Sequence, residues 1–374
     1  MITASSDVAT DVLVGTLRRL VECESPSADS AAVARSADLV AAIGDELFGR
    51  VPERIVVDGV SHLRWRFGAH TRVLVLAHHD TVWPSGTLTR LPFAVHEGTL
   101  TGPGCFDMKA GLAMALHAVA GLDDRDGVTV LVTGDEEVGS PASRALIEDT
   151  VRGARAALVL EASADGGALK LERKGVSLYE IGVHGLAAHA GLEPERGVNA
   201  TVALAHAVLA VSALADPARG TTVTPTVARS GATTNTVPAL ATFAVDVRAR
   251  TAAEQDRVDA AVRSLTAEVP GARLEVRGGV NRPPLEAAAS AALFQRAQRI
   301  AARLDLEPLR GTAVGGASDG NFTAGMGVPT LDGLGAVGGG AHAEHEHVVV
   351  ADLAPRTQLL RALLAELAAE QETP

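Results

Sequence analysis

The feature that most constrains the fold is a set of three short apolar runs separated by segments of helical character. The runs are "RVLVLA" at 72–77, "VTVLVT" at 128–133 and "AALVL" at 156–160. The segments "DMKAGLAMALHAVAGL" and "PASRALIEDTV" between them indicate helices, and Pro141 suits the first turn of the second one. Because alternating buried strands and helices build sheets covered by helices, the pattern predicts an α/β domain with a mostly parallel central sheet.

Each of these runs is followed at once by histidine or carboxylate residues. "HHD" follows the first run at 78–80, "GDEE" follows the second at 134–137, and Glu161 ends the third. In open α/β sheets, ligands bind in the crevice beyond the carboxyl ends of the strands. We therefore expect these side chains to share one site.

The order of predicted strands and helices changes around residue 176. The segment that follows has the order β-α-β-β-α-β, which is the order of a ferredoxin-like α+β module. After "NRPPLE" at 281–286 the alternation of helix and strand resumes. The sequence thus predicts a first part of the main domain at 1–176, an inserted module at 177–282, and the second part at 283–374.

Composition excludes several classes of partner. The net charge of −12 repels nucleic-acid phosphates and anionic lipid, and an aromatic content of 3% argues against base-stacking platforms. Cys23 and Cys105 cannot form a disulfide framework for 374 residues, which favours the reducing cytoplasm. The first residues predict an amphipathic helix capped near Asp7 rather than a signal peptide, and no apolar run approaches the roughly 20 residues that span a bilayer.

Two motifs combine a tight backbone turn with a candidate ligand. In "LAHHDTVWP", strand alternation points His78 and Asp80 the same way, so the carboxylate could orient the imidazole, although a polar loop explains the pattern equally well. His79 points oppositely. In "GPGCFDMKAG", Asp107 could cap a helix or, aimed by the rigid turn, could bridge two metal ions.

Further carboxylates and histidines complete a possible ligand set. Glu136 and Glu137 in "GDEEVGS" suit either a solvated turn or a general base beside a metal ligand. Glu161 ends a run so apolar that we expect it to have a partner. "GGGAHAEHEHVVV" adds three histidines, and their density alone does not distinguish a ligand from its neighbours. Mixed nitrogen and oxygen ligands suit zinc, with cobalt or manganese as substitutes.

Ten motifs in order carry a family resemblance. They are "HHDTVWPSGTLTRLPF", "GPGCFDMKAG", "GDEEVGS", "LEAS", "GLAAHAGLEPERGVNA", "TNTVP", "DVRAR", "RPPLE", "GGASDGN" and "GAHAEHEHV". Together they resemble the di-zinc aminoacylase and carboxypeptidase superfamily, whose main domain has the phosphorylase/hydrolase-like fold. The branch most similar is the glutamate carboxypeptidases (carboxypeptidase G), with acetylornithine deacetylases and succinyl-diaminopimelate desuccinylases as relatives. The resemblance covers residues from about 10 to 370.

The resemblance implies two zinc ions and assigns their ligands. His78 and Glu161 would hold one ion, Glu137 and His342 the other, and Asp107 would bridge both. The family also implies a cis peptide bond after Asp107.

The resemblance also implies catalytic roles. Asp80 would orient His78, and Glu136 would be the general base. His189 would reach a neighbouring subunit's active site and stabilise the oxyanion. The inserted module would then be a lid and dimerisation domain, and the protein a homodimer.

Substrate contacts are implied at four further positions. The residues that match substrate-binding motifs are Asn235, Arg248, Gly315 and Gly316. The guanidinium group of Arg248 would bind a terminal carboxylate through two hydrogen bonds. An ordinary turn asparagine, a salt-bridged arginine and a flexible loop are the alternatives.

Some positions depart from the family pattern or lack an assigned role. Ala188 and Ala110 stand where serine and glycine are frequent, which affects specificity more than catalysis. Three cations could serve a substrate carboxylate or be solvated: Lys170, Arg173 and Lys174. In the histidine-rich segment the resemblance selects His342 as ligand and matches Glu346 to a recurrent acidic position that could brace the loop. It gives no role to Glu344, His345 and His347.

The implied activity is that of a zinc-dependent hydrolase that cleaves the amide bond to a C-terminal amino acid, with glutamate expected. Its substrate would be a small peptide or an N-acyl amino acid. Two alternatives remain at this stage. One is an N-acyl-amino-acid deacylase of the same superfamily, and the other is a non-catalytic binding protein that retains the fold.

Overall fold

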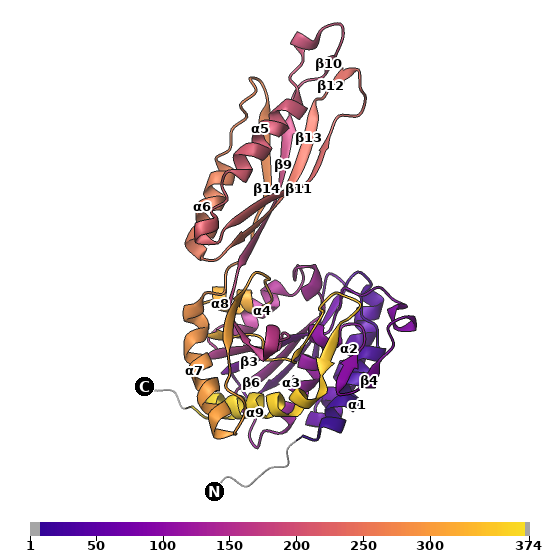
Figure 1. Ribbon diagram of the computed structural model, residues 1–374, viewed down its shortest axis with the longest axis vertical. Coiled ribbons are helices and arrows are strands. Elements are labelled where there is room, and N and C mark those ends of the chain that lie inside the picture. The colour runs from indigo at the N-terminus through magenta and orange to yellow at the C-terminus, as the bar shows by residue number, and fades with distance from the viewer. Residues whose placement is uncertain (1–7, 371–374) are drawn as a thin grey trace. The chain divides into compact units, whose positions relative to one another are not determined.

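The computed structural model describes residues 8–370, and these form two compact units. Unit 1 comprises the described residues up to 172 together with 287–314 and 318–370. Unit 2 comprises Arg173–Glu286 and Gly315–Ala317. Figure 1 shows the elements of each unit along the colour gradient of the chain.

Unit 1 is built on a mixed sheet with strand order β1-β2-β6-β3-β7-β16. Its strands are β1 (Glu53–Val57), β2 (Val60–Phe67), β6 (Val128–Thr133), β3 (Val73–His78), β7 (Ala156–Val159) and β16 (Thr330–Leu331). The pairs from β6 through β16 are parallel, and β1 and β2 add an antiparallel edge. The expected α/β fold with a largely parallel sheet is therefore confirmed.

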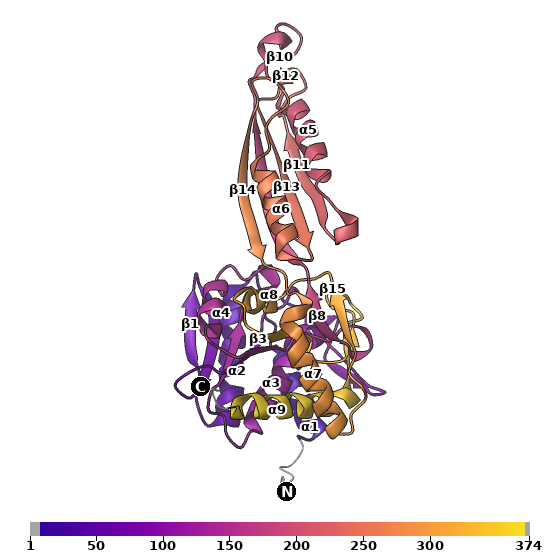
Figure 2. The ribbon, with the colours of Figure 1, turned by 90° about the vertical axis from the view of Figure 1, so that its left-hand side faces the viewer.

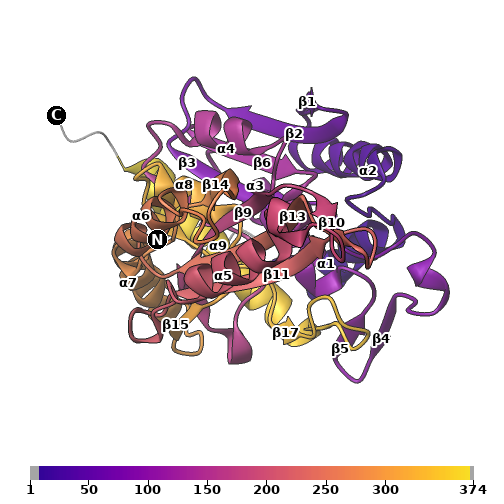
Figure 3. The same cartoon turned by 90° about the horizontal axis from the view of Figure 1, so that it is seen from above.

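Helices cover both faces of this sheet. They are α1 (Thr10–Glu22), α2 (Ser30–Phe48), α3 (Ala110–Ala120), α4 (Arg144–Val151), α7 (Ala287–Arg303), α8 (Gly320–Gly325) and α9 (Leu353–Ala369). One core cluster joins α1, α2, α3, α7 and α9 to one face, and a second joins α4 and α8 to the other. Figure 2 shows α7 beside α9, and Figure 3 shows α2 along β2. No helix among the described residues is long and apolar enough to cross a membrane.

Both faces are buried because the sheet strands are apolar on both sides. Every residue of β3, β6 and β7 is buried. Alternate residues contact opposite helical layers, with Val75 in the cluster of α3 and Leu74 in the cluster of α4. This double burial explains why the runs are continuously apolar instead of alternating.

Unit 1 also contains short strands outside the main sheet. A four-stranded sheet has the order β17-β18-β5-β4, and β15 pairs with β8. The bounds are β4 (Ala94–His96), β5 (Thr99–Thr101), β8 (Leu169–Arg173), β15 (Gly311–Val314), β17 (Gly338–Gly339) and β18 (His347–Val349).

The starts of two predicted helices are as follows. α4 is assigned from Arg144, and Pro141 lies in the turn that leads into it, where Arg144 N donates to Ser140 O at 3.0 Å and the N–H groups of Ala142 and Ser143 donate to the Asp135 carboxylate. α1 begins at Thr10, and the predicted cap at Asp7 lies outside the described residues.

Unit 2 has the ferredoxin-like topology that the sequence predicts. Its antiparallel sheet has the order β11-β13-β9-β14, which places the first and third strands of the β-α-β-β-α-β unit at the centre. Its elements are β9 (Gly175–His184), α5 (Ala200–Ser212), β11 (Thr222–Ser230), β13 (Leu240–Ala249), α6 (Ala252–Arg263) and β14 (Arg273–Arg282), and a small ribbon pairs β10 (Ala188–His189) with β12 (Thr236–Val237). α5 and α6 pack on one face of the sheet.

Candidate metal centre

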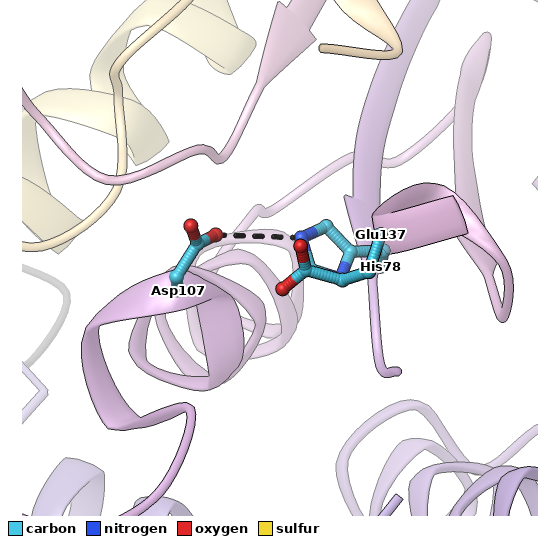
Figure 4. A group of neighbouring side chains, drawn as sticks. All are labelled: His78, Asp107 and Glu137. Carbon is cyan, nitrogen blue, oxygen red and sulfur yellow. Dashed lines mark ion pairs between the residues drawn. The ribbon is translucent and has the colours of Figure 1, made fainter. Parts of the chain in front are cut away.

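Three candidate ligands lie where neighbouring parallel strands of unit 1 end. His78 is the last residue of β3, Glu137 lies in the 3-10 turn η3 (Glu136–Val138) after β6, and Glu161 follows β7. Since β6, β3 and β7 are adjacent and parallel, their carboxyl ends meet at one edge of the sheet. Figure 4 shows His78 and Glu137 opposite Asp107.

Asp107 lies between two pairs of side chains. Its Oδ1 is 3.5 Å from His78 Nε2, and the same nitrogen is 3.7 Å from Glu161 Oε1. Its Oδ2 is 3.3 Å from His342 Nε2, which in turn is 3.2 Å from Glu137 Oε2. The two oxygens of one carboxylate thus face two separate His-Glu pairs.

Glu136 joins the same cluster. One ligand atom each from His78, Glu136 and Glu161 lies within 4.8 Å of the others, as do those of His78, Asp107 and Glu137. Glu136 is buried, so its carboxylate faces the cluster and not bulk solvent.

The cluster stabilises positive charge. Hydrogen bonds to Asp107 and Glu137 raise the pKa of His342 to about 10. Burial opposes the charged form of His78, but Asp107 and Asp80 outweigh it and raise the pKa of that imidazole well above its usual value. Burial likewise opposes ionisation of Asp107, yet its contacts with the imidazoles of His342 and His78 lower the pKa of its carboxyl.

These residues fit a bound metal ion. His78 Nδ1 lies 3.0 Å from the carbonyl oxygen of Asp80, an acceptor that keeps the proton on Nδ1 and turns Nε2 toward the carboxylates. Within residues 8–370, His78 Nε2 is buried and has no hydrogen-bond partner. A divalent cation would satisfy this nitrogen and replace the protons that the carboxylates attract. Imidazole and carboxylate together are a donor set that suits zinc.

Asp80 organises the neighbouring turn as well as His78. Its carboxylate accepts the backbone N–H groups of Glu136 and Glu137, each at 3.2 Å, and the hydroxyl of Ser27 at 2.7 Å. His78 Nδ1 is 3.4 Å from Asp80 Oδ1, so the carbonyl oxygen of Asp80 at 3.0 Å is the closer partner of the imidazole. Asp80 therefore contacts the candidate ligand His78 and the backbone of both glutamates at once.

The segment that carries Asp107 is an irregular turn. It spans Cys105–Lys109, and the Asp107–Met108 peptide bond is cis, as the family resemblance implies. Gly104 before it has φ +70°, and an added Cβ would lie 2.5 Å from Thr81 Cγ2. Glycine is required at this position because the backbone is left-handed and space is lacking.

The histidine-rich segment supplies one histidine to the cluster. His342 has φ +63°, a left-handed conformation that is uncommon for a residue with a side chain. His347 Nδ1 instead contacts the carbonyl oxygen of His345, and Glu344 pairs with Arg90 at the surface. Among residues 8–370, the imidazoles paired with Asp107 and Glu137 are those of His78 and His342, and not those of His345 or His347.

His189 and Asn235 lie together in unit 2. His189 is the Cα partner of Thr236, and Ala190 N donates to Asn235 O at 2.9 Å. His189 Nδ1 accepts the backbone N–H groups of Gly191 and Leu192, both at 3.1 Å. Because Nδ1 is an acceptor, the neutral ring carries its proton on Nε2, where it can donate to another group.

Arg248 forms an ion pair within its own strand. Its Nε and Nη2 donate to the two carboxylate oxygens of Asp246, each at 2.8 Å. This is the salt-bridged alternative that the sequence left open, and the spacing of two residues that puts both side chains on one face of β13 was visible in "DVRAR". Nη1 lies outside the pair and retains its donors.

The remaining candidate positions show mixed surroundings. Gly315 and Gly316 are exposed, and Gly316 O accepts a hydrogen bond from Arg173 Nη1 at 3.1 Å. Arg173 is buried and is therefore not a solvated cation. Lys170 lies in β8, where its backbone N–H donates to Asp332 O, and Lys174 lies just beyond that strand.

Two residues that hold the backbone at or next to candidate ligands carried little or no sequence signal. Buried Glu346 accepts the backbone N–H of Asp107, and Arg356 in α9 donates to the carbonyl groups of Gly333 and Gly335. Gly335 N in turn donates to Glu161 O at 2.9 Å. Their partners are backbone atoms, which every residue possesses, so no motif marks them. Only the family resemblance pointed to Glu346.

Comparison with known proteins identifies the family. The family model described as "Peptidase family M20/M25/M40" matches residues 74–366. Carboxypeptidase G2 of Pseudomonas sp. strain RS-16 is 30% identical over 96% of this chain and 89% of its own. Succinyl-diaminopimelate desuccinylase of Methylorubrum extorquens strain PA1 is 31% identical over 79% of this chain and 82% of its own.

A solved structure shows that the fold is shared. An M20 family metallo-carboxypeptidase from Sulfolobus solfataricus superposes with a TM-score of 0.72 at 17% identity, covering 95% of this chain and 99% of the other. With the family match over most of the chain, the chain belongs to peptidase family M20/M25/M40 and is a metal-dependent peptidase or amidohydrolase.

Proposed function

We propose that this chain is a two-zinc carboxypeptidase that hydrolyses the amide bond to a C-terminal amino acid, with glutamate preferred. The observation that carries the proposal is the position of Asp107, whose two oxygens lie 3.5 Å and 3.3 Å from His78 and His342 respectively. A carboxylate shared in this way suits two ions rather than one. Glu161 and Glu137 complete the two ligand pairs in this proposal.

The charge of the cluster supports two divalent ions. Asp107, Glu136, Glu137 and Glu161 bring four carboxylates together at the sheet edge. Buried charges need compensation, and two divalent cations balance four carboxylates. When bound, such ions would polarise the scissile carbonyl group and lower the pKa of a coordinated water molecule.

Glu136 is the general base in this proposal. Its carboxylate would take a proton from the attacking water and deliver it to the nitrogen of the leaving amine. The turn that holds it is anchored by the Asp80 carboxylate, which accepts the Glu136 N–H at 3.2 Å. A rigid turn keeps the base and the neighbouring ligand Glu137 in fixed positions.

Unit 2 would supply substrate contacts. The proton on His189 Nε2 would be donated to the oxyanion in a neighbouring copy of the chain, and Asn235 lies next to it. Arg248 would bind the terminal carboxylate through Nη1 while Asp246 orients its guanidinium group. The backbone N–H groups of Gly315 and Gly316 would contact the substrate as well. A homodimer is therefore part of the proposal, and unit 2 would be its lid and dimerisation domain.

The proposed preference for glutamate rests on the similarity to carboxypeptidase G2 and on the ten motifs. Carboxypeptidase G2 matches 96% of the chain, and the ten motifs resemble the glutamate carboxypeptidase branch. A deacylase is the second candidate because succinyl-diaminopimelate desuccinylases match at a similar identity over 79% of the chain. We also propose a cytoplasmic location, since Cys23 and Cys105 are both free thiols.

A substrate panel tests the proposal. Metal-free protein is prepared with a chelator, reconstituted with zinc, cobalt or manganese, and assayed on aminoacyl and folyl glutamates, on the same acyl groups linked to other amino acids, and on N-succinyl and N-acetyl amino acids. Hydrolysis of the glutamates that is lost with chelator and regained with metal supports a glutamate carboxypeptidase. Preferential hydrolysis of the N-succinyl or N-acetyl compounds would instead identify a deacylase.

Substitution of Glu136 tests the proposed base. Glu136→Ala should retain the metal content of the wild type and lower kcat by at least about a hundredfold. Glu344→Ala is the matched control, because Glu344 pairs with Arg90 at the surface and should leave kcat unchanged. Wild-type turnover in Glu136→Ala would remove this residue from the mechanism.

A further inference from the structure

Glu346 is a buried carboxylate whose oxygens each accept two hydrogen bonds. Oε1 accepts the backbone N–H groups of Phe106 at 2.9 Å and Asp107 at 3.0 Å. Oε2 accepts the backbone N–H of Gly104 at 2.9 Å and the indole N–H of Trp83 at 2.7 Å. The side chain is only 3% exposed, so the protein itself provides these donors in place of solvent.

Three of the four donors belong to the turn that carries Asp107. Successive backbone N–H groups that converge on one anion fix the conformation of the turn that contains them. In this turn the Glu346 carboxylate also accepts the N–H of Asp107, which fixes the backbone of Asp107 directly. The Asp107 side chain is thereby left with both oxygens directed at His78 and His342 and not at its own backbone.

Glu346 also lies in the same loop as His342. The loop connects β17 to β18 and is closed by hydrogen bonds from Ala343 N to Gly340 O and from Glu346 N to Ala343 O, both 2.9 Å. One carboxylate therefore links the loop that carries His342 to the turn that carries Asp107. These are two of the loops that supply candidate ligands, and they are 235 residues apart in the chain (342 less 107).

We propose that Glu346 is a positioning residue for the metal centre, which sets the Asp107 carboxylate relative to His342 and so determines the affinity for metal. The inference rests on the proposed assignment of Asp107 and His342 as ligands. Ligands must be held in place before the metal binds, because any freedom they lose on binding weakens the affinity. Residues that orient ligands typically contribute 10- to 100-fold to metal affinity.

The test uses a close pair of variants in one loop. Glu346→Gln keeps the size of the side chain but replaces one acceptor oxygen by an amino group that opposes the N–H donors. Glu344→Gln makes the same chemical change two residues away, at an exposed side chain paired with Arg90. Zinc and cobalt affinities are measured by competition with a chromophoric chelator, together with the visible spectrum of the cobalt-loaded protein and the melting temperature of the metal-free protein.

We expect Glu346→Gln to bind metal at least about tenfold more weakly than the wild type, and the spectrum of its cobalt-loaded form to differ. The substitution should lower kcat and change KM less. Glu344→Gln should stay within about twofold of the wild type. A Glu346→Gln protein with wild-type metal affinity and cobalt spectrum but a lower melting temperature would show a purely structural role and overturn the proposal.

A second variant decides the matter if Glu346→Gln does not fold. Trp83→Phe removes one of the four donors and keeps an aromatic ring in place. It should weaken metal binding by about tenfold, as expected for one lost hydrogen bond to a charged acceptor, and unchanged affinity would overturn the proposal. Since metal binding is measured without substrate, failure of the wild-type protein to cleave glutamyl substrates would refute the proposed function and leave this result standing.

Discussion

Arg356 is the residue whose removal should reveal how strongly a buried cation stabilises unit 1. It is 8% exposed, and its three nitrogens donate to the carbonyl groups of Gly335 at 2.6 Å, Gly333 at 2.6 Å and Gly167 at 3.0 Å. Burial lowers the pKa of the guanidinium group to about 10, against an opposing contribution of Asp352, so the side chain remains charged near neutral pH.

The magnitude follows from these contacts. Arg356→Met fills most of the volume but leaves three carbonyl groups without their donor. A hydrogen bond to a charged group contributes about 1.5 to 3 kcal/mol, and deleting one partner of a buried charged network costs about 3 to 5 kcal/mol in total because the contributions do not add. At about 2 to 4 °C per kcal/mol for a domain of this size, the melting temperature should fall by about 6 to 20 °C.

The assay is thermal unfolding of metal-free protein followed by circular dichroism, with Arg303→Met as control. Arg303 pairs with Glu366 at the surface, and losing an exposed ion pair should cost less than about 1 kcal/mol. A fall of less than about 3 °C in Arg356→Met would refute the reasoning, because the carbonyl groups of Gly333, Gly335 and Gly167 would then be satisfied without Arg356. Because Gly335 N donates to Glu161 O, we also expect weaker metal binding in this variant.

The remaining predictions concern the ligand histidine, the stability of unit 2 and substrate binding. His342→Ala should lower metal affinity and kcat at least about a hundredfold, while His347→Ala should leave both unchanged, as measured by metal titration and turnover. Hydrogen bonds from two arginines lower the pKa of Glu254 from 4.5 to about 2, so its stabilisation is present above about pH 4.5 and is lost as the pH falls toward 2. Metal-free Glu254→Gln should therefore lose less stability than the wild type on acidification to about pH 3, and equal losses would contradict this. Asp246→Asn should raise KM for glutamyl substrates about tenfold with a smaller change in kcat, if Asp246 orients Arg248 as proposed.

Much of the fold and the geometry of the sheet edge could be predicted because both follow from periodicity. Short, largely apolar runs of five or six residues separated by helical segments indicate strands buried on both faces, and the parallel order follows from the helices between them. His78 and Glu161 then lie at one edge, since adjacent parallel strands end together. The two-fold alternation along a strand also predicted that His78 and Asp80 approach each other.

The surroundings of Arg248 show a limit of the same reasoning. Its sequence context allowed a substrate-binding role and a salt bridge equally, and the structure shows the bidentate pair with Asp246. The spacing of two residues predicted that both side chains lie on one face of β13, but not which anion the guanidinium group would bind. Local sequence determines to which face of a strand a side chain points. Which charged group the side chain then binds depends on distances that only the folded chain sets.

Residues that hold the candidate ligands were the hardest to predict, for a physical reason. A carboxylate that binds metal uses at least one of its oxygens for the ion, so hydrogen bonds to its backbone position it without occupying those oxygens. Three buried charged groups act in this way, with Asp80 accepting two N–H groups of η3, Glu346 accepting three N–H groups before and at Asp107, and Arg356 donating to the 333–335 segment.

These three groups act on the candidate metal centre without belonging to its proposed ligand set. Each acts on the backbone of a ligand-bearing turn, or on a segment hydrogen-bonded to one, so substituting it leaves the number and type of metal ligands unchanged. The expected effect is a loss of metal affinity in proteins whose ligand residues are all intact. In the proposed site, motifs indicate the residues that would carry the chemistry, whereas of the buried charges that position them through the backbone, Arg356 had no sequence signal, Asp80 was marked by its motif and Glu346 by the family resemblance alone.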